Sequence, residues 1–307
     1  MIQDRKKQKP FLDYREQIDR LSERGCQIED EAHCLSILRT VGYYRLTGYL
    51  LPFRLPNSEK YQDGTSITKV YQIYEFDRKL RNLLLQSLEV IEVSLRASLA
   101  HFHAATERYG PIGYYEKESF NTKHNHERFR ESVNREIQHQ QGSLIVQHYQ
   151  KDYNGIFPLW VAMGFFTFGM LAFFYDDLKT ADKKKFLREY YPSIHYRVMG
   201  SWLRCCTDLR NLCAHYNRLY FRQFTAIPKR VTPKKGEQRS LWEEREQRSL
   251  WPLICVMKEL YPNEKEWEQE FANKLKSLFD EYRSSVKLSQ LGFPEDWEAR
   301  IKSMHSL

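Results

Sequence analysis

The chain has 307 residues, of which 41% are hydrophobic and 29% are charged; this composition excludes a disordered tail and a small disulfide-stapled module. Forty-eight Lys and Arg against 40 Asp and Glu leave a net charge of +8, which favours an anionic partner, with nucleic acid as the first candidate. The six cysteines form no C-x-x-C pair, and no secretory signal precedes them, so we expect reduced thiols, a cytoplasmic location and no structural zinc.

Helical periodicity dominates the chain. Apolar residues recur at spacings of three and four, which predicts an all-α fold, and no useful β-alternation is present. The longest apolar stripe runs from Val70 to Phe102 and predicts one long helix over residues 68–102. We expect further helices over residues 13–24, 30–39, 126–149, 160–175, 201–219, 250–260 and 264–286.

Four regions follow from this pattern. We expect an N-terminal helical region over residues 1–65, a central helical domain over 66–226, a basic loop over 227–247 and C-terminal helices over 248–307. The loop carries a run of lysines and arginines, and its hexapeptide EQRSLW at 237–242 recurs at 246–251, across the boundary with the C-terminal helices. We interpret the loop as an exposed insertion.

One segment lacks charge altogether. Residues 156–175 carry no charged side chain over twenty positions, which is about the length that spans a hydrocarbon core. Pro158, Gly164 and Gly169 interrupt the run, and the whole chain is polar, with a mean hydropathy of -0.68. We therefore expect a wholly buried central helix in preference to a membrane span.

Chemistry-bearing side chains gather near the end of another predicted helix. Asn211, His215 and Arg218 are four and three positions apart and so share one face, towards which the long Arg210 can curl, whereas Tyr216 lies on the opposite, apolar stripe. A histidine can move the proton of a 2′-hydroxyl, and an arginine can hold the phosphate as its charge builds. These groups predict RNA cleavage without metal or cofactor. The alternative is a solvated helix face whose histidine caps a neighbour.

Several sequence blocks resemble those of one known family, the Abi-like family, which is the AbiD and AbiF group of bacterial abortive-infection proteins. The run RNLCAHYNRL at 210–219 resembles its signature R-N-x-C-A-H-x-x-R-L. Further blocks that resemble the family occur in family order, namely GYYRLTGY at 42–49 with the following PFR, FDRKLR at 76–81, IEVSLR at 91–96, PLWVA at 158–162 and TFG at 167–169. The resemblance therefore covers the chain from about residue 9 to residue 222.

The resemblance implies a helical bundle of the HEPN type with N-terminal and C-terminal helical extensions. In such domains an R-x(4–6)-H motif forms a metal-independent RNase site, commonly completed by a second copy across a homodimer. Carried over by motif, Arg210 would bind phosphate, Asn211 would orient the site and His215 would be the acid/base. Arg218 matches the trailing arginine of the signature, and we expect it to position phosphate.

The expected function is an endoribonuclease effector of abortive infection, that is, of phage defence by halted growth. The resemblance also implies association with a small structured RNA, so the alternative is a non-catalytic RNA-binding protein that forms a complex with such an RNA. A third possibility is a protein-interaction module with an acidic partner.

Two positions bear on this expectation. Gly164 stands where many relatives have a glutamate, which removes a carboxylate that could position the site. Arg96 and His101 fit a second R-x4-H pattern. We favour a structural interpretation of this second pattern, in which Arg96 pairs with Glu92 at i, i+4.

Additional RNA contacts are predicted where aromatic rings alternate with guanidinium groups, because such a surface stacks bases and holds phosphates. Core packing would explain the rings equally well. The predicted contacts beyond Arg218 are Tyr43, Tyr44, Arg45, Arg54, Arg78, Arg81, Lys234 and Lys235.

Overall fold

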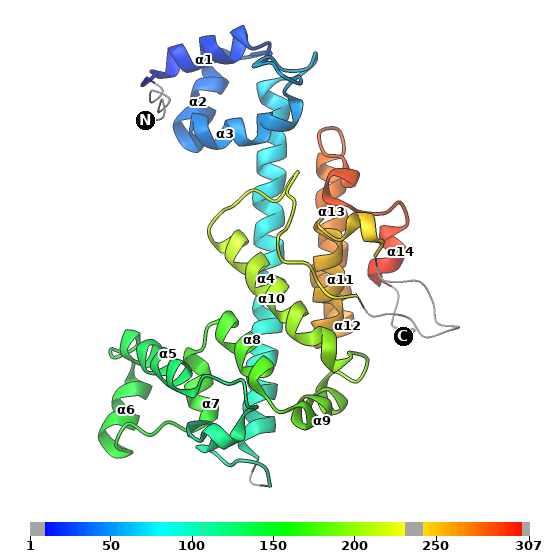
Figure 1. The fold of residues 1–307 in the computed structure, drawn as a ribbon. Helices are drawn as coiled ribbons and strands as arrows, with labels where there is room; N and C mark the ends of the chain where they lie inside the picture. The colour runs from blue at the N-terminus through cyan, green and yellow to red at the C-terminus, as the bar shows by residue number, and fades with distance from the viewer. Residues whose placement is uncertain (1–9, 106, 231–241, 303–307) are drawn as a thin grey trace, which may run out of the picture.

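A single long helix organises the molecule. The structure, a computed structural model, describes residues 10–105, 107–230 and 242–302 and confirms the all-α prediction. Helix α4 (Ile67–Ala104) has 38 residues and forms the spine against which helices from every region pack (Figure 1). Its length, about 57 Å at 1.5 Å per residue, confirms the helix predicted from the apolar stripe. The described residues form no strand, only two isolated bridges.

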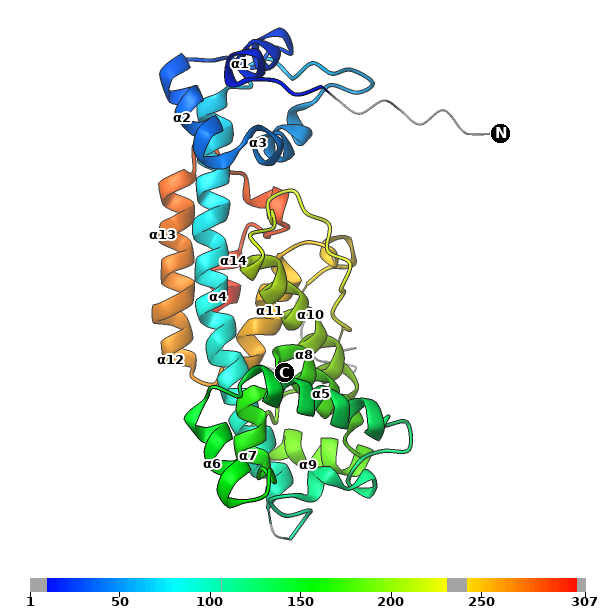
Figure 2. The same cartoon turned by 90° about the vertical axis from the view of Figure 1, so that its left-hand side faces the viewer.

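Three short helices lie at one end of α4 (Figures 1 and 2). They are α1 (Tyr14–Glu23), α2 (Glu31–Val41) and α3 (Tyr43–Leu50). Asp13 and Asp30 cap the first two through their carboxylates, which explains why both begin where the sequence predicts. Gly42 separates α2 from α3 with φ at +85°, a conformation that favours glycine. The structure adds α3, which the sequence analysis did not predict, and packs it against α4.

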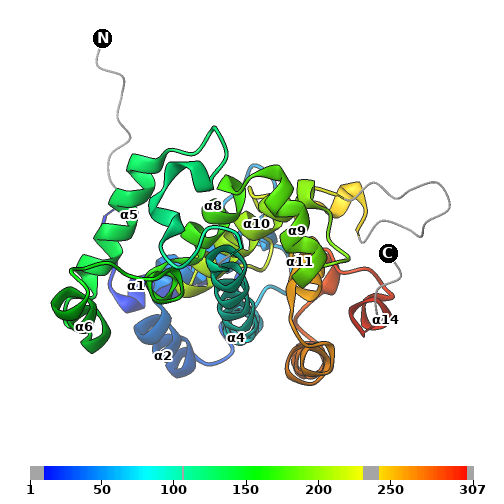
Figure 3. The same ribbon diagram turned by 90° about the horizontal axis from the view of Figure 1, so that it is seen from below.

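The opposite end of α4 carries five helices, of which α9 was not predicted from the sequence. The segment expected to form one helix over 126–149 forms α5 (His126–His139) and α6 (Leu144–Asp152). After these come α7 (Leu159–Ala162), α8 (Phe168–Asp177) and α9 (Thr180–Tyr190). Viewed along α4, α5 and α6 lie on one side of the spine and the C-terminal helices on the other (Figure 3).

The uncharged segment 156–175 is not one buried helix, so that prediction is wrong. Phe166 is extended, and the Thr167 side chain caps α8, which separates α8 from α7. Trp160 and Phe173 are 56% and 66% exposed. Among the residues that the structure describes, no helix combines the length and apolar character needed to cross a bilayer.

The C-terminal part of the chain returns to the spine. Helix α10 (Tyr196–Ala214) packs against α8 and α4. Helix α11 (Trp251–Leu260) packs on α10 and α4, and α13 (Asn273–Tyr282) runs beside α4 (Figure 2). The other α- and π-helical elements described in this part are α12 (Glu264–Glu266), a π-helical turn at Trp267–Ala272 and α14 (Trp297–Lys302). Buried apolar residues from Ile18 to Ile301 belong to one continuous core.

The predicted basic loop is only partly described. Lys234 and Lys235 lie outside the described residues. Trp242, expected in an exposed segment, is 1% exposed, so the loop prediction is wrong at that position. The six cysteines are all buried, and no disulfide joins any of them.

Candidate functional site

The segment that carries the predicted catalytic residues leaves its helix earlier than expected. Helix α10 ends at Ala214, His215 is its C-cap, and Tyr216 turns the chain with φ at +57°. Residue 218 therefore lies beyond the helix. The prediction that Arg218 shares a helix face with Asn211 and His215 is therefore wrong. It relied on an apolar spacing that continues in the sequence beyond the residue at which the helix ends.

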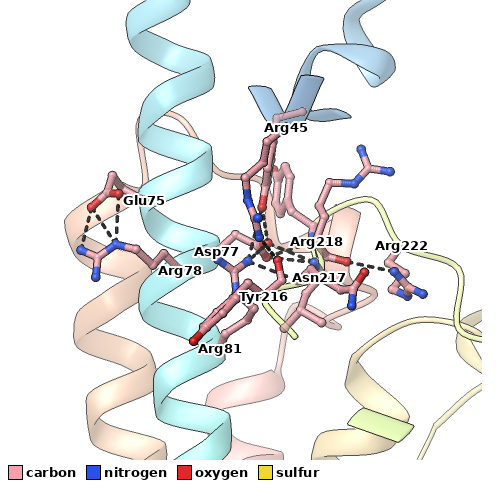
Figure 4. A network of polar contacts seen from close by, with 12 residues as sticks. Arg45, Glu75, Asp77, Arg78, Arg81, Tyr216, Asn217, Arg218 and Arg222 are labelled. Carbon is pink, nitrogen blue, oxygen red and sulfur yellow. Dashed lines mark hydrogen bonds and ion pairs between the residues drawn. The ribbon is translucent and has the colours of Figure 1, made fainter. Parts of the chain in front are cut away.

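The chain after this turn is hydrogen-bonded to a buried carboxylate. Asp77 on α4 is 0% exposed and accepts hydrogen bonds from the Tyr49 hydroxyl at 2.7 Å and from Arg81 Nη1 at 2.6 Å. The backbone N–H groups of Leu219 and Tyr220 each donate to it at 3.0 Å (Figure 4). Burial raises the pKa of this carboxyl, and Arg81 with the other donors opposes the rise by stabilising the charged form. The network therefore ties α3, α4 and residues 219–220 together.

Arg81 is part of this network and is not available to RNA. Its side chain is 3% exposed, and Nη1 also donates to the Asn217 carbonyl at 3.3 Å. The prediction of Arg81 as an RNA contact is wrong. Arg81 lies on the polar side of α4 when that helix is considered alone, but in the folded protein the turn at residues 215–220 covers it. Asp77, four positions earlier, was the signal that could have identified a buried ion pair.

Two further arginines, one on each side, join the turn to α3. Arg218 donates to the Gly48 carbonyl and lies over the Tyr49 ring at 6.0 Å, and burial lowers its pKa. Arg45 donates to the Tyr216 carbonyl (Figure 4). Arg218 is thus half-buried and engaged with backbone, whereas Arg45 remains exposed. Because these contacts join blocks 42–49, 76–81 and 210–219, the three sequence blocks form one structural unit.

The predicted catalytic residues lie on the open side of this unit. In the last turn of α10, Arg210 Nη1 donates to Asn211 Oδ1 at 3.2 Å, and its guanidinium is 3.8 Å from Glu92 on α4. Asn211 and His215 are exposed, and the Arg210 side chain is 42% exposed. The structure thus brings Arg210 and Asn211 into contact and places His215 at the end of the same helix.

Glu92 is a further candidate site residue, which was considered above only as a partner of Arg96. It is 13% exposed and lies between two guanidinium groups, with Arg96 at 2.8 Å and Arg210 at 3.8 Å. All three line an open groove of about 620 Å³ along α4. A carboxylate is therefore present near Arg210, contributed by α4.

The arginine of the second R-x4-H pattern forms the predicted ion pair with Glu92, and Arg96 also donates to the Phe166 carbonyl at 2.9 Å. The structural role of the whole pattern stays a prediction. His101 Nδ1 is 2.6 Å from the Tyr190 hydroxyl. Arg96 is therefore engaged in holding α4 to the segment between α7 and α8.

Comparison with known proteins identifies the family of this chain. A family model described as Abi-like protein matches residues 36–221. The chain belongs to the Abi-like protein family. No curated protein and no solved structure matches the chain. The family match suggests a role in abortive infection, a form of phage defence, and it covers the whole unit formed by the three blocks around Asp77.

The remaining predicted RNA contacts of this Abi-like protein differ in accessibility. Tyr44 is 93% exposed, and Arg45 and Arg54 are also exposed. Arg78 is exposed but pairs with Glu75 at 2.8 Å. Tyr43 packs partly against the core with its hydroxyl buried. The accessible predicted contacts are therefore Tyr44 and Arg45 on α3, Arg54 in the segment after it, and Arg78, whose charge is partly neutralised by Glu75.

No candidate metal centre accompanies these residues in the described ranges, where no group of three or more His, Cys, Asp or Glu side chains converges. His124 and His126 come closest, with ring nitrogens 3.2 Å apart. Their other nitrogens contact the Asp177 carboxylate and the Tyr115 carbonyl. This pair connects α5 to α8 at the end of the molecule remote from α3.

Proposed function

We propose that this Abi-like protein is an endoribonuclease effector of abortive infection, with Arg210, Asn211 and His215 as its catalytic residues. The observation that carries the proposal is the arrangement at the end of α10. His215 is exposed there, and one turn earlier Arg210 is oriented by Asn211 at 3.2 Å and by Glu92 at 3.8 Å. An exposed imidazole and an oriented guanidinium near the end of one helix are the two groups that RNA cleavage by 2′-hydroxyl attack requires.

The chemistry divides between the two side chains. His215 removes the proton of the 2′-hydroxyl, and the 2′-oxygen attacks the adjacent phosphorus. Arg210 binds the phosphate oxygens as negative charge builds on them, and Asn211 holds the guanidinium in place. The bond from phosphorus to the 5′-oxygen breaks, and that oxygen takes up a proton. The products are a 2′,3′-cyclic phosphate and a 5′-hydroxyl.

The proposal includes a homodimer and an RNA partner. One histidine must both remove and return a proton, and a second copy of His215 across a dimer would divide these tasks between two groups. The exposed Tyr44, Arg45 and Arg54 would bind a structured small RNA next to the same turn.

The test measures cleavage by protein stripped of copurified nucleic acid, with total RNA in the presence of EDTA. We expect the wild type to create 5′-hydroxyl ends, which polynucleotide kinase labels without prior phosphatase treatment. His215→Ala should lower this activity by at least about a hundredfold, the smallest usual contribution of acid–base catalysis. The matched control is His101→Ala, which replaces the histidine of the other R-x4-H pattern and should retain activity.

Two outcomes contradict the proposal. If the wild type leaves RNA intact under every condition and still binds it tightly, the protein is an RNA-binding protein without catalysis. If the wild type neither cleaves nor binds RNA, both nucleic-acid functions are wrong. Equal loss of activity in His215→Ala and His101→Ala would contradict the assignment of the site to α10.

A further inference from the structure

Tyr216 combines a costly backbone conformation with an exposed ring. Its φ is +57°, in the left-handed region that residues other than glycine seldom occupy, and its side chain is 67% exposed. The prediction that Tyr216 belongs to the apolar stripe of a helix is wrong. The unfavourable conformation is held by hydrogen bonds from Tyr216 N to the Cys213 carbonyl at 3.0 Å and from Asn217 N to the Leu212 carbonyl at 2.8 Å.

A second exposed ring belongs to α3, the helix that this turn contacts. Arg45 donates to the Tyr216 carbonyl, which joins the turn to α3 (Figure 4). The residue before it, Tyr44, is 93% exposed. Two solvent-facing aromatic rings therefore accompany one exposed guanidinium, and the first ring belongs to the residue that directly follows His215.

Burial does not explain these rings, because large exposed aromatic side chains gain nothing from the core. Aromatic faces beside cationic groups are the arrangement that stacks nucleobases and tracks their phosphates. Bases in a duplex are stacked inside the helix and cannot present a free face along its length, whereas unpaired bases can.

We propose that Tyr216 is a base-stacking residue that holds an unpaired base next to the phosphate cleaved at His215, with Tyr44 as a second platform. The substrate class is therefore single-stranded RNA or the unpaired part of a structured RNA. This inference rests on the proposed function and extends it from the reacting groups to the choice of substrate. An acidic peptide that packs against the same rings is the competing partner.

The experiment measures binding in a His215→Ala background, so that no RNA is cleaved. Fluorescence anisotropy compares a labelled single-stranded RNA with the fully paired duplex of the same sequence. We expect Tyr216→Ala to weaken single-strand binding about tenfold, the effect typical of a lost base stack, and to leave duplex binding unchanged. Tyr216→Phe keeps the ring and should bind as the parent protein does.

Two controls separate the ring from the fold. Tyr216→Gly removes the ring but suits the positive φ, so it should lose single-strand binding while its Tm rises or stays the same. Tyr153→Ala removes a tyrosine that is 52% exposed on the segment after α6, and it should bind RNA normally.

The outcomes distinguish this inference from the proposed function. If RNA is bound and cleaved but Tyr216→Gly and Tyr216→Ala bind the single strand as tightly as the parent protein, the stacking role alone is wrong. An equal loss for single strand and duplex also overturns it. If the protein binds neither RNA, the proposed function and the stacking role fail together, and a poly-glutamate peptide used as the probe then tests the acidic partner.

Discussion

The two halves of segment 210–219 place their polar groups in opposite environments. Residues 210–215 present Arg210, Asn211 and His215 at an open surface. Beyond the exposed Tyr216 and Asn217 the chain turns inward, and the backbone N–H groups of Leu219 and Tyr220 donate to Asp77, which is fully buried on α4. One short sequence block therefore contains both the residues that can meet a partner and the residues that fix their position.

The difference predicts different energetic consequences. A buried charge is stabilised only by its partners, so removing one of them leaves the others uncompensated. Exposed polar groups exchange protein contacts for water at little cost. Substitutions at the buried half should therefore change stability, and substitutions at the open half should change activity.

The largest effect is expected at Asp77. Asp77→Ala leaves the buried Arg81 guanidinium and the N–H groups of Leu219 and Tyr220 without their acceptor, and should lower the free energy of unfolding by about 3–5 kcal/mol. The measurement is urea denaturation followed by circular dichroism. The matched control is Glu75→Gln, which removes a carboxylate that pairs with the exposed Arg78 on the other side of α4 (Figure 4) and should cost less than about 1 kcal/mol. Equal costs at the two positions would contradict the distinction.

A second buried group on α4 predicts a pH dependence. His103 is 0% exposed, stacks on Tyr109 at 4.7 Å, and its ring nitrogens have no hydrogen-bond partner among the described residues. Burial, with a smaller contribution from Arg108, lowers its pKa from 6.5 to about 4. Between these values the unfolded chain binds a proton that the folded chain does not, so stability is complete above pH 6.5 and falls as the pH is lowered towards 4.

The expected loss over this interval is about 3 kcal/mol from His103 alone. His103→Phe keeps an aromatic ring and cannot titrate, so its unfolding free energy should fall less between pH 6.5 and pH 4 than that of the wild type. Parallel curves for the two proteins would show that His103 is not held neutral by the core.

The fold was predictable where local signals agree. The apolar stripe predicts α4, and the caps at Asp13 and Asp30 predict where α1 and α2 begin. Apolar spacing gave a wrong prediction at residues 201–219, where it continues past the end of the helix. Helix α10 ends at Ala214 because Tyr216 adopts a positive φ. The sequence does not indicate this helix end, since glycine is the residue that usually adopts that conformation and the position holds a tyrosine.

The site was predictable only in its local part. Arg210 and Asn211 are neighbours in sequence and are hydrogen-bonded in the structure, whereas their catalytic role stays a prediction. The burial of Arg81 depends on hydrogen bonds from Leu219 and Tyr220 to Asp77, over 142 and 143 positions. Sequence periodicity describes one helix at a time and contains no information on which distant turn covers it.

The smallest effect on stability is expected at His215. The side chain is exposed at the end of α10, so His215→Ala should change the free energy of unfolding by less than about 0.5 kcal/mol, as surface substitutions usually do. Three residues later, Arg218→Ala removes a half-buried side chain that donates to the Gly48 carbonyl and packs over Tyr49, and should cost about 1–2 kcal/mol. Urea denaturation of both variants measures the contrast across the turn. A His215→Ala variant as unstable as Arg218→Ala would place His215 in the structural half of the segment, and any loss of RNA cleavage in that variant would then report misfolding instead of chemistry.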